Sequence, residues 1–277
     1  MSEEWQPVRP AHSIECVATV LTYNEPLTEH LVKRVLRQAE RLALQEGLSD
    51  RSDVRSLQFA LAPDQVHAAR TQVEGLAFQR SGHQTQAGRL LLEDLVVSRN
   101  ELVYRSFDYV RWSDYLQKIN ALMLPLAELS AAGTAMRSLR LEYQDRFIPR
   151  DRSKYRIDQL LVPHQMIAEH IFETDDLWHS HSGKMLTVDD DKMLVHLNVD
   201  LVSGETIGPA PQEILSVGIM TAFERRYGKN KLDVESAVIE SIAGHLGDLH
   251  SRSKNLFRSI LAPQVAERVG LGESVVH

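Results

Sequence analysis

The 277-residue chain is 43% apolar and 25% charged, close to the averages of globular proteins, which argues against disorder over most of its length. A net charge of -7 argues against a protein that coats nucleic acids, because such proteins need a basic surface. The single cysteine, Cys16, excludes an intrachain disulfide and a thiolate zinc site, and we interpret it as a small buried hydrophobe.

The N-terminal residues lack the positive segment and the apolar core of a signal peptide. No stretch of the sequence approaches the ~20 consecutive apolar residues that a membrane helix requires. The sequence therefore predicts a cytoplasmic protein that does not use a membrane as its partner.

The first half predicts a strand, a helix, several strands and a second helix. Branched and apolar residues predict the strand over 14–21, and a helical stripe with Pro26 near its start and Gly47 at its end predicts the first helix. Alternating patterns predict further strands between residues 48 and 110, with a loop over 79–89 and a hairpin turn over 98–100. Residues 112–129 predict a helix that Pro125 kinks or breaks.

The second half predicts a similar order of elements. Residues 135–147 and 192–202 alternate between apolar and polar side chains, which predicts strands, and a long helix or helix pair is expected from about Asp233 to Leu261. We therefore predict an α+β fold with either two similar α/β lobes or one large antiparallel sheet packed by long helices. The predicted lobes are residues 1–132 and residues 133–277, and the second lobe ends in the long helix.

Signatures of common enzymes are missing from the chain. It lacks the phosphate-binding motifs GxxxxGK[ST] and GxGxxG, the GxSxG nucleophile elbow and the HExxH zinc motif. These absences favour a non-enzymatic protein, and no cofactor is expected.

Histidines provide an alternative reading as a metal site. His179 and His181 have the alternating spacing that places two side chains on one face of a strand. Together with His245 and Asp248 they could bind zinc, manganese or iron, which would make the chain a metal-dependent hydrolase such as a nuclease. The three carboxylates of residues 189–191 are interpreted as a solvated turn.

The predicted C-terminal helix carries His245 and His250 beside an apolar stripe. The stripe consists of Val234, Val238, Ile242, Leu246, Leu249, Leu256 and Ile260. Helical spacing places both histidines on a polar shoulder of that stripe, where Asp248 and Arg252, four residues apart, can form an ion pair. The sequence favours a structural role for this shoulder over a catalytic one.

The segment 137–158 concentrates basic and aromatic side chains. Its seven basic and four acidic residues leave a local charge of +3. Arginines interleaved with aromatic rings suit a protein interface, and they also suit contacts to phosphates and bases. The candidate binding residues are Arg137, Arg140, Tyr143, Arg146, Arg150, Arg152, Tyr155 and Arg156.

Short motifs follow one another in a characteristic order. Tyr109 and Trp112 precede a predicted helix, and residues 139–143 form a strand motif of the LRY-N-I type, with Asp145 in place of its Asn. The C-terminal helix then carries a motif of the LH----N-F type, formed by Leu249, His250, Asn255 and Phe257. This order resembles a sporadically distributed family of uncharacterised bacterial proteins of about this length.

The resemblance implies an α+β protein without established catalytic residues, of the accessory kind that comes and goes between related bacteria. By analogy, it also implies a role in anti-phage defence or in a toxin-linked system. The sequence thus predicts a cytosolic, non-enzymatic binding or regulatory component with a protein partner. The alternatives are the metal-dependent hydrolase and a nucleic-acid sensor that acts through residues 137–158. The oligomeric state stays open.

Overall fold

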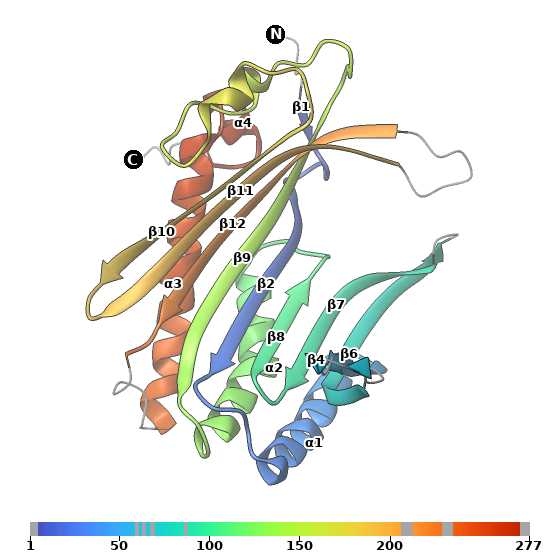
Figure 1. Ribbon diagram of the computed structural model, residues 1–277, viewed down its shortest axis with the longest axis vertical. Helices are drawn as coiled ribbons and strands as arrows, with labels where there is room; N and C mark the ends of the chain where they lie inside the picture. Colours follow the sequence, from blue (N-terminus) through green and yellow to red (C-terminus); the bar gives the residue numbers. More distant parts are fainter. Residues whose placement is uncertain are drawn as a thin grey trace.

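The computed structural model describes residues 5–58, 61–62, 65–66, 70–85, 88–205, 213–228 and 235–271. In this part of the chain a ten-stranded antiparallel sheet packs against helices (Figure 1). The fold class is therefore α+β, as predicted, and of the two expected arrangements the single large sheet is the one that forms.

The strands of the large sheet are β1 (Trp5–Pro7), β2 (Ile14–Tyr23), β3 (Asp50–Gln58), β6 (Arg70–Thr85), β7 (Gly88–Ser98), β8 (Glu101–Ser106), β9 (Met136–Pro149), β10 (Trp178–Val188), β11 (Asp191–Glu205) and β12 (Glu213–Arg226). A separate ladder pairs β4 (Leu61–Ala62) with β5 (Gln65–Val66). The helices are α1 (Glu29–Gln45), α2 (Trp112–Ala131), α3 (Glu235–Ile260) and α4 (Pro263–Arg268), with 3-10 turns η1 (Ile157–Gln159) and η2 (Glu169–Phe172).

The sheet contains two antiparallel meanders, one on each side of its centre. β2 pairs with β9 in the middle, and the order continues as β8-β7-β6-β3 on one side and as β12-β11-β10 on the other, while β1 also pairs with β9. A helix follows each meander, α2 after β8 and α3 after β12. Both predicted halves thus contribute to one sheet, and the boundary between residues 132 and 133, in the turn from α2 to β9, stays a prediction.

Helices α1, α2 and α3 pack in a row on one face of the sheet (Figure 1). Side chains alternate between the two faces of β11. The buried Val195, Leu197 and Val199 face the helices, whereas His196 and Asn198, on the other face, are only partly buried. The apolar residues of the strands and helices form a continuous core between the two layers. None of the described helices is long and apolar enough to cross a membrane.

The first helix begins later than predicted. Thr28 is its N-cap, and the Oγ1 atom of Thr28 accepts a hydrogen bond of 3.3 Å from the backbone N–H of Leu31. Pro26 therefore lies outside the helix, because the threonine supplies the side-chain acceptor that helix starts require. Gly47 follows the helix end with φ of 84°, in the left-handed region that favours glycine.

Two further corrections concern Pro125 and the loop expected over residues 79–89. α2 continues through Pro125 as one helix, so the predicted break is wrong, whereas the kink stays a prediction. β6 extends to Thr85 and β7 starts at Gly88, because polar residues of the two strands pair as a ribbon, for example Gln84 with Arg89. The hairpin turn over 98–100 is confirmed, and the Oγ atom of Ser98 accepts hydrogen bonds from two backbone N–H groups within it.

The long C-terminal helix is confirmed as α3, with a small change in its buried stripe. Ile242, Leu246 and Leu249 face the core as predicted. Phe257 is buried while Leu256 is only partly buried. The expected stripe residues Val234 and Val238 lie outside the described side chains.

Cys16 is buried on β2, as the sequence predicts. Burial raises the pKa of its thiol to about 12. A thiol that stays protonated at neutral pH is a poor nucleophile, so Cys16 has the inert character of a core residue.

Candidate functional site

A pocket of about 320 Å³ lies where α2, α3, β9 and the two ends of the described chain meet. Tyr109, in the segment before α2, and Trp112, the first residue of α2, form part of its wall. β9 contributes Tyr143 and Asp145, and β12 contributes Thr221. α3 contributes residues from His250 to Phe257, and the segments 11–14 and 269–271 complete the lining.

His250 is the residue on which the pocket's contacts converge. Its ring stacks on the indole of Trp112, with ring centroids 4.2 Å apart and an interplanar angle of 3°. Its Nδ1 atom is hydrogen-bonded to the Oη atom of Tyr143 at 2.9 Å. Burial, with a smaller effect from the charge of Lys254, lowers the pKa of His250 to about 4. The imidazole is therefore neutral at physiological pH and can stack without bringing a charge into the pocket.

Asp145 is the buried acid of the pocket, with only 3% of its surface exposed. The Oγ atom of Ser13 donates a hydrogen bond of 2.7 Å to its Oδ1 atom. Burial raises the pKa of Asp145 to about 7, against the lowering effect of the Ser13 hydrogen bond. Near neutral pH the carboxyl group can therefore either accept two hydrogen bonds as an anion or donate one as an acid.

The remaining wall combines aromatic rings with paired hydroxyl groups. Tyr109 meets Tyr143 edge-on, with ring centroids 6.1 Å apart and an interplanar angle of 88°. The hydroxyl groups of Thr221 and Ser253 are hydrogen-bonded to each other at 2.7 Å, and both residues are buried. Lys254 is an exposed cation of the lining.

These contacts suit ligand binding better than nucleophilic catalysis. A serine nucleophile needs a basic group that takes its proton. Among the lining residues, His250 is hydrogen-bonded to a tyrosine, whereas Ser13 is bonded to Asp145 and Ser253 to Thr221. The hydroxyl groups of the two serines, Ser13 and Ser253, are thus bonded to groups other than His250.

Residues from all three sequence motifs meet in this pocket. Tyr109, Trp112, His250 and Phe257 line it, although Tyr143 and His250 lie 107 positions apart in the chain. Leu249 is instead fully buried in the core and Asn255 is exposed, so neither lines the pocket.

Neither a scan of protein-family models nor a search of curated proteins gives a match. The resemblance to a bacterial family, which was inferred from the motif residues, therefore stays a prediction. Their convergence is a property of this structure that the order of the motifs alone did not predict.

The candidate binding residues of segment 137–158 do not form one surface. Along β9, Tyr143 faces the helices, while Arg140 and Arg146 alternate with it on the other side of the strand. Arg140 forms an ion pair with Glu142, and Arg146 pairs with Glu15 at 2.7 Å.

The other members of that set lie at the two ends of the segment. Arg137, near the start of β9, is exposed. Arg150, Arg152, Tyr155 and Arg156 follow the end of β9, where Tyr155 packs edge-on against Trp5 at a centroid distance of 5.6 Å. Because a strand turns alternate side chains to opposite faces, a compact stretch of sequence becomes several separate surfaces here.

The four residues of the alternative metal site lie in two places. His179 and His181 are neighbours on β10, with ring centroids 4.1 Å apart. His245 and Asp248 lie on α3, where Asp248 forms the predicted ion pair with Arg252 at 2.8 Å. Among the described residues, His179 and His181 form a cluster of metal-binding groups with Asp200 of β11.

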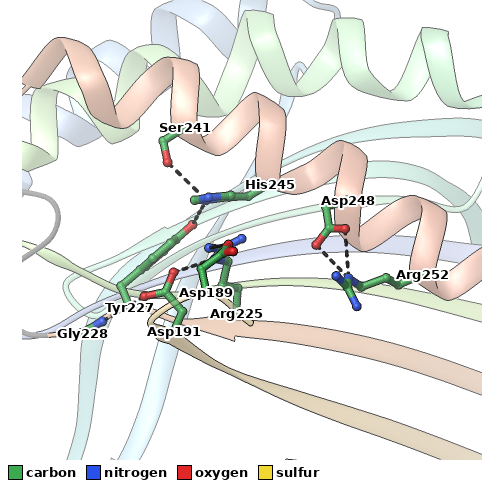
Figure 2. A network of polar contacts seen from close by, with 9 residues as sticks. All are labelled: Asp189, Asp191, Arg225, Tyr227, Gly228, Ser241, His245, Asp248 and Arg252. Atoms are coloured by element: carbon green, nitrogen blue, oxygen red, sulfur yellow. Dashed lines mark hydrogen bonds and ion pairs between the residues drawn. The ribbon is translucent and has the colours of Figure 1, made fainter. Parts of the chain in front are cut away.

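Figure 2 shows that His245 belongs to a separate polar network at the ends of β11 and β12. Its Nδ1 atom lies 3.1 Å from the Oη atom of Tyr227 and 3.2 Å from the Oγ atom of Ser241. Burial, together with the positive charge of Arg225, lowers the pKa of His245. These contacts tie α3 to the end of β12, which agrees with the structural role expected for this histidine.

An ion pair between strands forms the other part of that network. The Nε atom of Arg225 donates to Asp191 at 2.7 Å, and its guanidinium also reaches Asp189 at 3.1 Å. The interpretation of residues 189–191 as a solvated turn applies to the exposed Asp189 and Asp190. It is wrong for Asp191, whose side chain is only 2% exposed, because Asp191 starts β11 and its carboxylate is needed by a buried arginine.

The sequence did not lead us to predict that Asp145 lines a pocket or that Asp200 lies beside two histidines. Asp145 occupies an inward position of an alternating strand, between Tyr143 and Phe147, and a carboxylate at such a position was the available signal. Asp200 sits on the polar side of β11, and only the register that pairs it with His179 brings it to the histidines. That register is a long-range property which the pattern of one strand does not contain.

Proposed function

We propose that the chain is a binding component which holds a small ligand with a flat ring and a hydrogen-bond donor in the pocket around His250 and Asp145. The observation that supports this proposal is the convergence of Trp112, Tyr109 and His250 on a buried carboxyl group. The volume of about 320 Å³ lies within the range of about 300–1,000 Å³ of ordinary ligand pockets.

The chemistry of the wall defines the ligand class. Aromatic rings favour a flat apolar group, because such groups stack or meet edge-on at the contact distances seen between the pocket's own rings. Asp145 favours an amide, amidine or amine, because each of these donates hydrogen bonds to a carboxylate. A cationic donor would stabilise the ionised form of Asp145, so its affinity should increase as the pH rises through the pKa of about 7.

The test uses three probes of nearly equal shape: benzamidine, benzamide and benzoate, titrated into the full chain by calorimetry at about pH 6 and about pH 8. We expect benzamidine to bind most strongly, with a dissociation constant of about 1 mM because the probe is small, and to bind better at the higher pH. Benzoate should bind most weakly, because its carboxylate would meet the carboxyl group of Asp145.

Two variants and a matched control assign the binding to the pocket. Asp145→Asn should remove the pH dependence and weaken benzamidine about tenfold, the size of one charge-assisted hydrogen bond. Trp112→Ala should weaken both benzamidine and benzamide. Asp176→Asn makes the same chemical change at an exposed position and should alter nothing. Equal affinity for the three probes, or unchanged binding by Asp145→Asn, would refute the proposed ligand class.

The wider role of this binding component is proposed on the sequence alone. The cytoplasmic location, the protein partner and a regulatory part in a bacterial defence or toxin-linked system follow from the missing catalytic signatures and the family resemblance. A nucleic-acid sensor is the less favoured alternative, since Arg140 and Arg146 already pair with acids.

A further inference from the structure

A second group of chemically active side chains lies at the edge of the sheet formed by β10. His179 and His181 are exposed, whereas the intervening Ser180 is buried, so both histidines lie on one side of the strand. His179 pairs in register with Asp200 of β11, whose neighbours Val199 and Leu201 face the core. The two imidazoles and the carboxylate therefore share the face of the sheet that the helices leave uncovered.

The distances within this group are those of ligands around one ion. One ligand atom from each of the three residues lies within 4.8 Å of the others, and the Nδ1 atom of His179 is 2.9 Å from the Oδ1 atom of Asp200. Two ligand atoms that each lie about 2.1 Å from one metal ion are about 3.0 Å apart at a right angle and about 3.4 Å apart at a tetrahedral angle.

The carboxylate of Asp200 contains an oxygen atom that a bound metal ion would stabilise. Its Oδ1 atom is shielded from solvent and has no hydrogen bond within the described part of the chain, although His179 is close. The two atoms are near each other, but they do not have the alignment of a hydrogen bond. A shielded carboxylate oxygen without a hydrogen bond is unfavourable unless a cation accompanies it.

We propose that His179, His181 and Asp200 bind one divalent transition-metal ion of the zinc class. Two imidazole nitrogens and one carboxylate oxygen suit zinc, cobalt, nickel or iron, and they do not suit ions that prefer oxygen ligands alone. Three protein ligands leave at least one coordination position for water or an added ligand, as in exchangeable metal sites and unlike closed four-ligand structural sites. The site is distinct from the pocket around His250 and does not depend on a ligand there.

The experiment uses the full chain without a polyhistidine tag, freed of metal by a chelator that is then removed. Titration with zinc should give one ion per chain by calorimetry. His181→Asn and Asp200→Asn should each weaken binding at least about tenfold, because each removes one of three ligands. Cobalt should give a visible absorption spectrum whose intensity reports the coordination number, and the same variants should abolish it.

Two control variants separate this site from other histidines. His30→Asn changes an exposed histidine of α1 and should bind zinc as the natural chain does. His245→Asn should also bind normally, whereas a loss in this variant would point back to a site that includes α3. Circular dichroism checks that the variants are folded, which we expect for the two ligand variants because His181 is exposed and the side chain of Asp200 is 34% exposed. Zinc binding that is absent, or unchanged in His181→Asn and Asp200→Asn, would overturn the proposal.

Discussion

At the scale of single residues, Asp145 is a buried carboxyl group whose ionised form is disfavoured by its surroundings. Its pKa is 3.8 in an ordinary environment and about 7 in the folded chain, so the folded state binds the proton more tightly than the unfolded state. The free energy of unfolding therefore decreases as the pH rises from about 3.8 to about 7, and it is constant outside that window for this group. Three pKa units correspond to about 4 kcal/mol of lost stability.

The variant Asp145→Asn should be more stable than the natural chain at about pH 8 and should lose the part of the pH dependence that Asp145 causes. The amide has nearly the same shape and never ionises. Urea unfolding of both proteins from about pH 4 to about pH 8 measures this effect, because other groups contribute equally and cancel in the difference. If the free energy of unfolding had the same pH dependence in both proteins, folding would not raise the pKa of Asp145, which would contradict this prediction.

The same residue links stability to the proposed ligand. An unliganded pocket contains a carboxyl group whose charge is unfavourable, and a cationic donor would compensate that charge.

At the scale of elements, the Asp191–Arg225 pair holds β11 to β12 where the two strands meet α3. Both side chains are almost inaccessible, with 2% and 8% of their surfaces exposed. Removing one member of a buried pair leaves the other charge without compensation, which is costlier than removing an exposed pair.

Asp191→Ala should therefore lower the free energy of unfolding by about 3–5 kcal/mol. Asp189→Asn removes the charge of the other carboxylate that Arg225 contacts and keeps a residue type that tolerates the φ of 54° at this position. Because Asp189 is 73% exposed, this change should cost at most about 1 kcal/mol. Thermal and urea unfolding of the two variants measures the contrast. Equal losses in both would mean that burial does not decide the strength of this pair.

The elements that the sequence predicted well are those with one buried face. The alternation of Val195, Leu197 and Val199 identified β11, and the apolar stripe of residues 242–249 identified α3, because burial imposes the period of the element on the sequence. The ribbon of β6 and β7 near Thr85 was missed because polar side chains there show no such period. The pairing of the two strands forms it.

For the whole molecule, the sequence left open whether the halves form two lobes or one sheet. The decision lies in the pairing of β2 with β9, two strands separated by more than a hundred residues, and no local pattern records such a contact. The candidate site was predictable only in part, because long-range contacts also bring its residues together. The motifs identified Tyr109, Trp112 and His250, but only the fold shows that they surround Asp145.

Since the core continues from one half of the sheet to the other, we expect the chain to unfold in a single cooperative transition. Urea unfolding followed by circular dichroism and by amide hydrogen exchange should give coincident curves for residues 5–131 and residues 136–271. Two separated transitions would instead identify the halves as independent domains. They would support the predicted boundary between residues 132 and 133.

The parallel stack of Trp112 on His250 has an optical consequence. A protonated imidazole quenches the fluorescence of an indole that it touches, whereas a neutral imidazole does so far less. The pKa of about 4 keeps His250 neutral over the physiological range, so the emission of Trp112 is expected to stay bright there. Any event that places a proton on this imidazole, or that separates the two rings, would be visible as a change in light emitted by the protein itself.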